Sequence, residues 1–114
     1  MKGAEVKGRR VRLFLRLTAG VNNRLRMLMR YHGELSEYVD QALMSFDLRS
    51  IDLIPVAVGR RTRGMTAIIS GTANMRLRSA ARWRGCTVTE LANSALHKWL
   101  GQKNVLTRSI QEGL

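Results

Sequence analysis

The chain carries an internal repeat, and this feature constrains its fold more than any other. The Arg-Leu-Arg segment from Arg24 to Arg26 recurs from Arg76 to Arg78, 52 positions further on. Other residues match at that spacing: Asn22 with Asn74, Arg30 with Arg82, Tyr31 with Trp83, and Gly33 with Gly85. Beyond the shared glycine the spacing becomes 53, as for Ser36 and Thr89. A unit of under about 40 residues rarely folds alone, so we expect the two copies to share one core as an intramolecular dimer.

The net charge points to the class of partner. The 114 residues include 20 basic and 8 acidic side chains, a formal net charge of +12. The stretches 6–33 and 53–89 contain bases and no acid. Such a surplus indicates a polyanion, either nucleic acid or an anionic membrane. Most of the bases are arginine, which favours phosphate and base edges because the guanidinium donates two parallel hydrogen bonds. We expect this charge to lie on one side of the molecule.

Several other classes of protein are disfavoured. Cys86 is the only cysteine, so an internal disulfide or a cysteine-rich metal site is excluded. His32 and His97 have no partners at metal-ligand spacing, and no glycine-rich phosphate loop follows a strand. No apolar run approaches the ~18 residues of a membrane span. Peripheral membrane binding requires a basic amphipathic helix with bulky apolar anchors, and the first helix of the second repeat is too rich in alanine for that. We therefore expect a cytoplasmic protein that is not an enzyme and has no metal site, cofactor or membrane contact.

The first repeat reads as strand, helix, helix. Residues 11–17 alternate between apolar and polar, as in a half-buried strand. Thr18 offers a helix N-cap, and Gly33 is expected to end the first helix in the left-handed conformation. The predicted inward residues of the two helices are Val21, Leu25, Leu28 and His32, then Leu35, Val39, Ala42 and Phe46.

The second repeat has the same order. Met65, Ala67 and Ile69 are expected to face inward from a strand, and Ser70 to cap the next helix. Gly85 is expected to end that helix, and Thr87 and Glu90 to form a capping box at the start of the last one. The remaining predicted inward residues are Ala73, Leu77, Ala80 and Ala81, then Val88, Ala92, Ala95 and Trp99.

These patterns divide a single domain into segments. A basic arm spans 1–9, the first repeat 10–46, a linker 47–61, the second repeat 62–100 and a tail 101–114. The apolar centre of the linker, 51–58, is expected to pack on the core. The arm either tracks a DNA backbone or is disordered, and the tail either frays or prolongs the last helix.

The order strand, helix, glycine turn, and a helix that opens on Ser/Thr-Glu resembles the ribbon-helix-helix family of bacterial DNA-binding proteins. Its most specific piece is the segment from Gly85 to Leu91, and the likeness covers both repeats. The resemblance implies a mainly α fold with a short two-stranded antiparallel β-ribbon, formed here by one chain as a pseudo-dimer. In that family the ribbon enters the DNA major groove, which can admit two strands.

The resemblance also implies which residues bind DNA. The outward residues of the strands become base readers: Arg12, Phe14 and Arg16 in the first repeat, Thr66 and Ile68 in the second. The start of each second helix becomes a phosphate clamp, made by Leu35 and Ser36 and by Val88 and Thr89. Charge adds four candidate phosphate contacts: Arg10, Arg60, Arg61 and Arg63.

Some positions depart from the family pattern or stay open. Glu34 stands where the second repeat has Thr87, which puts an acid beside a proposed phosphate. Phe14 and Ile68 are unusual base readers, and either can instead turn inward. The arginines of the Arg-Leu-Arg segments contact phosphates or lie on solvated helix faces. Tyr31 and Trp83 stack on bases or, more consistent with their spacing, lie in the core or at its rim.

The leading functional hypothesis is sequence-preferring binding of double-stranded DNA. Within the family, the chain is similar to accessory virulence proteins of Agrobacterium that assist T-DNA border processing. That likeness implies a role beside a relaxase in DNA transfer, and a transcriptional repressor is the other possibility for the same binding activity. The alternative is a protein-interaction scaffold or antitoxin-like module with only nonspecific DNA binding. The chain is expected to be a pseudo-dimeric monomer that binds DNA in more than one copy.

Overall fold

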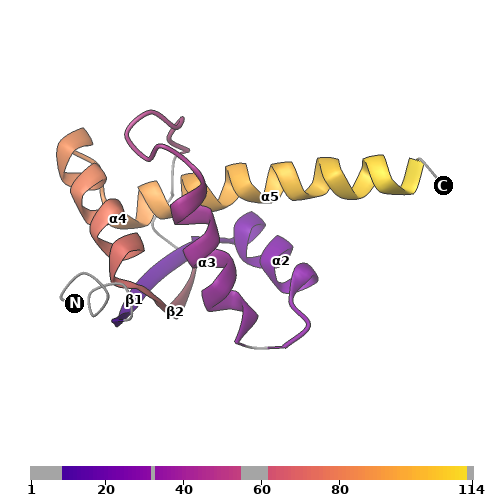
Figure 1. The fold of residues 1–114 in the computed structure, drawn as a ribbon, viewed down its shortest axis with the longest axis horizontal. Helices are drawn as coiled ribbons and strands as arrows, with labels where there is room; N and C mark the ends of the chain where they lie inside the picture. Colours follow the sequence, from indigo (N-terminus) through magenta and orange to yellow (C-terminus); the bar gives the residue numbers. More distant parts are fainter. Residues whose placement is uncertain (1–8, 32, 55–61, 113–114) are drawn as a thin grey trace.

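The computed structural model describes residues 9–31, 33–54 and 62–112, with side chains up to Lys103. In chain order the elements are β1 (Arg10–Thr18), α2 (Ala19–Leu28), α3 (Glu34–Ser45), β2 (Thr62–Ser70), α4 (Gly71–Arg84) and α5 (Val88–Glu112) (Figure 1). The described part is thus mainly helical, with one two-stranded antiparallel sheet. Each repeat has the predicted order of strand, helix, helix.

The two strands pair symmetrically about their middle. Their register runs from Arg10 opposite Ser70 to Thr18 opposite Thr62, and the central pair is Phe14 with Thr66. These two residues also correspond to each other in the repeat, since they lie 52 positions apart. The register of the sheet and the spacing of the repeat therefore define the same approximate twofold axis.

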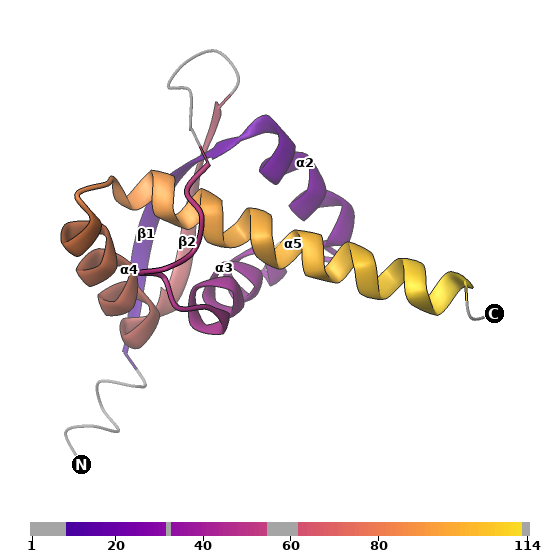
Figure 2. The ribbon, with the colours of Figure 1, turned by 90° about the horizontal axis from the view of Figure 1, so that it is seen from above.

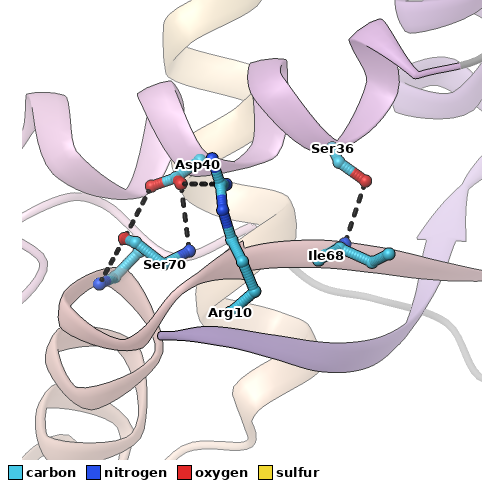
Figure 3. Close-up of polar contacts among 6 residues, drawn as sticks. Arg10, Ser36, Asp40, Ile68 and Ser70 are labelled. Carbon is cyan, nitrogen blue, oxygen red and sulfur yellow. Dashed lines mark hydrogen bonds and ion pairs between the residues drawn. The ribbon is translucent and has the colours of Figure 1, made fainter. Parts of the chain in front are cut away.

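The second helix of each repeat docks on the strand of the other repeat. In one half, Asp40 of α3 accepts hydrogen bonds from the Ser70 amide (3.0 Å) and hydroxyl (3.1 Å) (Figure 3). In the other half, Asn93 of α5 accepts the Thr18 amide at 3.0 Å and donates to the Arg16 carbonyl at 2.9 Å. Each helix thereby occupies polar groups on the outer edge of a strand, an edge that would otherwise be open to further pairing.

One hydrophobic cluster of the described residues draws on both repeats, as predicted. Leu13, Leu15 and Leu17 project from the inner face of β1 and are at most 1% exposed. Ala67 and Ile69 project from β2 into the same cluster, while Met65 is only partly buried. The cluster also contains the predicted helix residues Val21, Leu25, Val39, Ala42, Ala73, Leu77, Ala80, Ala81, Ala92, Ala95 and Trp99. The helices therefore cover one face of the sheet and leave the other face open.

Most of the predicted helix ends are confirmed. Thr18 and Ser70 cap α2 and α4 through the amides of Val21 and Ala73. Gly85 ends α4 with a φ of 69°, in the left-handed region where glycine is favoured. At the start of α5 the Thr87 hydroxyl oxygen accepts the Glu90 amide at 3.0 Å, as expected of a capping box. The Glu90 carboxylate, however, accepts from the Thr87 hydroxyl instead of a backbone amide.

The prediction for the end of α2 is wrong. The helix ends at Leu28, well before Gly33, and Gly33 has a right-handed φ of −66° as the residue before α3. The cause lies in Glu34, which is only 3% exposed and accepts the Arg30 amide at 2.8 Å. The Tyr38 hydroxyl lies 2.7 Å from the other carboxylate oxygen of Glu34 and 3.2 Å from the Leu28 carbonyl. The side chains of Glu34 and Tyr38 thus bond backbone groups at the end of α2, whereas α4 ends at a left-handed glycine.

The last helix is longer than the predicted second repeat. It continues through Glu112, so most of the expected tail is helical, and in both views α5 runs out beyond the other elements (Figure 2). In the linker, Leu48 and Ile51 are buried against the core. Of the apolar centre, 51–58, Ile51 therefore packs as expected, whereas Leu53 is 37% exposed and 55–61 lie outside the described residues. None of the helices in the described residues is long and apolar enough to cross a membrane.

Candidate nucleic-acid interface

The open face of the sheet presents the predicted base readers. Arg12, Phe14 and Arg16 are exposed on β1, and Thr66 and Ile68 are exposed on β2. Phe14 is 62% and Ile68 47% exposed, so neither turns into the core. Both strands lack acidic residues. The sheet therefore offers cationic and apolar side chains together on one surface without nearby carboxylates of its own.

The register distributes these side chains unevenly. Arg12 lies opposite Ile68, Phe14 opposite Thr66, and Arg16 opposite Gly64. Gly64 is a site residue that the sequence reasoning missed. A Cβ built on Gly64 would lie 2.8 Å from Cζ of Phe14, so the phenyl ring crosses over this glycine. The available signal was the repeat itself, because Gly64 stands where the first repeat has Arg12.

A groove joins the sheet to the start of α3. It has a volume of about 430 Å³ and is lined by Arg12, Gly33, Leu35, Ser36, Thr66 and Ile68. Three of these are predicted base readers and two are predicted phosphate-clamp residues, which the fold thus brings together. The Ser36 hydroxyl oxygen accepts the Ile68 amide at 2.9 Å and fixes the helix start against β2 (Figure 3). No side chain caps α3, and the amides of a helix's first turn lack partners within the helix.

Glu34 does not line this groove. Its carboxylate is held by the Arg30 amide and the Tyr38 hydroxyl, and its Oε1 lies 3.4 Å from Nε of Arg30. The hydrogen bond from Tyr38, followed by that from the Arg30 amide, lowers the pKa of Glu34 below its usual value. The acid that the sequence placed beside a phosphate is therefore engaged at the end of α2.

The second predicted clamp lies at the start of α5. Val88 and Thr89 are half-buried there, directly after Thr87, whose side chain caps the helix. They correspond to Leu35 and Ser36 of the first repeat, but α3 begins without a side-chain cap, whereas Thr87 caps α5. The two helix starts are therefore equivalent in position and unequal in capping.

The predicted phosphate-binding arginines have different surroundings. Arg10 is exposed at one end of the sheet, with Nη1 3.7 Å from the Asp40 carboxylate (Figure 3). Arg63 is exposed within β2, where it shares the inward side of the strand with Met65 instead of the open face. Arg60 and Arg61 lie outside the described residues.

Some arginines outside the sheet serve the fold. Arg76 donates to the Phe46 carbonyl at 2.7 Å, at the end of α3. Arg84 donates to the carbonyls of Leu48 and Ile51, at 3.1 and 2.6 Å, and holds the segment that follows. Arg26 and Arg78 bond the side chains of Asn22 and Asn74 one turn earlier, at 3.4 and 3.0 Å. Part of the basic charge outside the sheet is therefore engaged in bonds within the fold.

Neither Tyr31 nor Trp83 lies in the core. Tyr31 is 57% and Trp83 64% exposed. The guanidinium of Arg49 lies over the Trp83 ring, 5.2 Å from its centroid. Trp99 is only 5% exposed and Phe46 is partly buried, consistent with their predicted inward positions.

Comparisons of the chain with protein-family models, with curated proteins and with solved structures find no match. The function is therefore inferred from the residues and geometry of this chain.

Proposed function

We propose that the chain is a tandem ribbon-helix-helix protein that binds double-stranded DNA with sequence preference by laying its two strands in the major groove. The observation that carries the proposal is the open face of the sheet. Arg12, Phe14 and Arg16 of β1 are exposed on this face, and neither strand of the sheet contains an acidic residue. Arginine donates in bidentate fashion to guanine O6 and N7, the commonest specific contact in the major groove.

The dimensions support this arrangement. Two paired strands lie about 4.8 Å apart, and the major groove of B-DNA is about 12 Å wide. The groove at the start of α3 joins Arg12, Thr66 and Ile68 to Leu35 and Ser36 in the first turn of that helix. A phosphate there would accept hydrogen bonds from the helix start while the neighbouring strands reach the base edges.

In the cell, such binding fits an accessory factor in DNA transfer or processing that acts beside a relaxase, or a transcriptional repressor. Several copies on adjacent sites are compatible with either role. Mapping the selected motif distinguishes them, because a transfer origin or border and a promoter are different positions in a genome. The competing function is a protein-interaction scaffold whose DNA binding is only electrostatic.

The test is a selection from random duplexes at two salt concentrations, followed by sequencing. We expect a motif that survives the higher salt, because base contacts persist when phosphate contacts weaken. Arg12→Ala and Arg16→Ala should each weaken binding to the motif by roughly 5- to 150-fold, the value of one good bidentate contact. Arg82→Ala removes the same charge from an exposed position on α4 and serves as the control.

Two results would refute the proposal. If steep salt dependence accompanies no enriched motif, binding is to phosphates alone, and the scaffold function is favoured. If a motif is enriched but all three arginine variants weaken binding equally, the sheet is not the reader.

A further inference from the structure

The centre of the open face is occupied by an exposed aromatic ring. Phe14 and Thr66 form the middle pair of the register and correspond to each other in the repeat, so the approximate twofold axis passes between them. In a complex of the proposed kind, this pair would lie over the middle of the bound site. Phe14 is 62% exposed there, so most of the ring is available to a ligand.

The surroundings of Phe14 form an apolar strip. The ring crosses Gly64, whose missing side chain leaves room for it: an added Cβ would lie 2.8 Å from Cζ and 3.2 Å from Cε2. Ile68, two residues beyond the partner Thr66, is 47% exposed on the same face. Thr66 itself carries a methyl group. The strip therefore offers little hydrogen bonding and much apolar surface to whatever the sheet contacts.

In the major groove one base-pair group suits such a strip. The C5 methyl of thymine is the apolar group on the base edges, whereas guanine, adenine and cytosine present acceptors and donors there. A phenyl ring placed over those polar edges would remove water from them without replacing its hydrogen bonds, which is unfavourable. Thymine methyls instead gain from burial against the ring.

Two arginines share the open face with this strip. Arg12 and Arg16 lie on either side of Phe14 on β1, four residues apart. At about 3.3 Å per residue their Cα atoms are separated by about 13 Å along the strand, which corresponds to about four base steps of 3.4 Å. Guanines read by the two arginines would therefore lie on opposite sides of the base pairs under Phe14.

We propose that Phe14 is a specificity-determining residue that reads thymine methyl groups at the centre of the target site, between two guanines read by Arg12 and Arg16. This inference rests on the proposed function, because it assigns the bases that the same face selects. Contact with thymine methyls would account both for the exposure of the Phe14 ring and for the glycine at position 64, which leaves room for the ring.

The test uses the motif selected by the whole 114-residue chain. Each central thymine is replaced in turn by deoxyuridine, which removes the C5 methyl and keeps the base pairing. Every methyl that contacts the strip should make the dissociation constant about fourfold larger when removed. Deoxyuridine placed outside the motif is the control on the DNA side.

Two variants assign the effect to the ring. Phe14→Ala should weaken binding to the thymine duplex and abolish the response to deoxyuridine, since the ring that touches the methyl is gone. Gly64→Ala keeps the phenylalanine but forces its ring to shift, because the added Cβ would lie 2.8 Å from Cζ. This variant should therefore reduce the loss of affinity that deoxyuridine causes. Met75→Ala is the matched control, because Met75 is a 63% exposed apolar residue that lies on α4, outside the sheet.

The outcomes separate this inference from the function on which it rests. No enriched motif in the selection refutes the proposed function. A motif without central thymine, or one that binds equally well with central deoxyuridine, refutes the role of Phe14 and leaves the proposed function standing. A deoxyuridine effect of unchanged size in Phe14→Ala also refutes it, because another residue then contacts the methyl.

Discussion

Asn93 offers the sharpest test of how the two repeats are held together. It is fully buried, and its side chain makes three hydrogen bonds: from the Thr18 amide at 3.0 Å, to the Arg16 carbonyl at 2.9 Å and to the Thr89 carbonyl at 2.8 Å. The first two groups belong to the outer edge of β1, whereas Thr89 lies within α5 itself. Asn93→Ala therefore removes the polar link between the last helix of one repeat and the strand of the other.

The expected cost follows from which groups lose their partners. The Thr89 carbonyl lies within α5 and can accept a backbone amide of that helix, so the loss of its hydrogen bond from Asn93 should cost little. The Thr18 amide and the Arg16 carbonyl are left without this partner, at about 1–3 kcal/mol for each buried unsatisfied group. Because both sites are partly buried and water can relieve some of the penalty, we expect Asn93→Ala to lower the free energy of unfolding by about 2–4 kcal/mol.

Denaturant unfolding followed by circular dichroism measures this cost, and a thermal melt should show a decrease of roughly 10 °C or more in Tm. Asn74→Ala is the matched control, since the Asn74 side chain bonds only an exposed Arg78 within α4, and it should cost less than about 0.5 kcal/mol. Equal stabilities of the two variants would refute the reasoning that Asn93 joins the repeats. Asn93→Asp extends the test, because a carboxylate facing two carbonyl oxygens should destabilise the fold more as pH rises above about 4.

Two further predictions concern the turns that end α2 and α4. In the folded protein the pKa of Glu34 is lowered by the Tyr38 hydroxyl and the Arg30 amide, so the stability this carboxylate contributes is present above its ordinary pKa of 4.5 and is lost as pH falls below it. The loss of stability between pH 6 and pH 3, measured by denaturant unfolding, should be smaller in Glu34→Gln, and an unchanged profile would contradict this assignment. Gly85→Ala should destabilise the fold by about 1 kcal/mol, because φ is 69° there. Gly101 lies inside α5 with open space around an added Cβ, so Gly101→Ala should instead stabilise the fold by about 0.5–1 kcal/mol. Changes of the same sign in the two variants would count against a left-handed requirement at Gly85.

Local patterns in the sequence were sufficient for the strands and most helix ends. The alternation from Val11 to Leu17 gave the buried face of β1, and the caps at Thr18 and Ser70 depend only on residues three positions away. Such signals are readable because the interacting groups are close in the chain. The pairing of the strands, which no local pattern contains, was implied by the resemblance to the ribbon-helix-helix family.

Features that depend on distant contacts were not predicted. The early end of α2 depends on Glu34 and Tyr38, which reach back to the helix from the next element. Arg76 and Arg84 were counted with the surface charge, yet each bonds backbone carbonyls some 30 residues away. The residues next to an arginine in the sequence do not show whether its side chain bonds a distant carbonyl or faces solvent. Only the fold distinguishes structural arginines from solvent-exposed ones.

The two repeats correspond in how they hold each other and differ on the open face of the sheet. Asp40 and Asn93 accept the amides of Ser70 and Thr18 in corresponding positions, and both first helices carry the same asparagine-arginine bond. On the open face, by contrast, the corresponding residues all differ: Arg12 and Gly64, Phe14 and Thr66, Arg16 and Ile68. A dimer of two identical chains must present the same side chains in both halves. A duplicated chain is free of that constraint, so a symmetric scaffold can carry an asymmetric open face, and a DNA site bound as proposed need not have twofold symmetry.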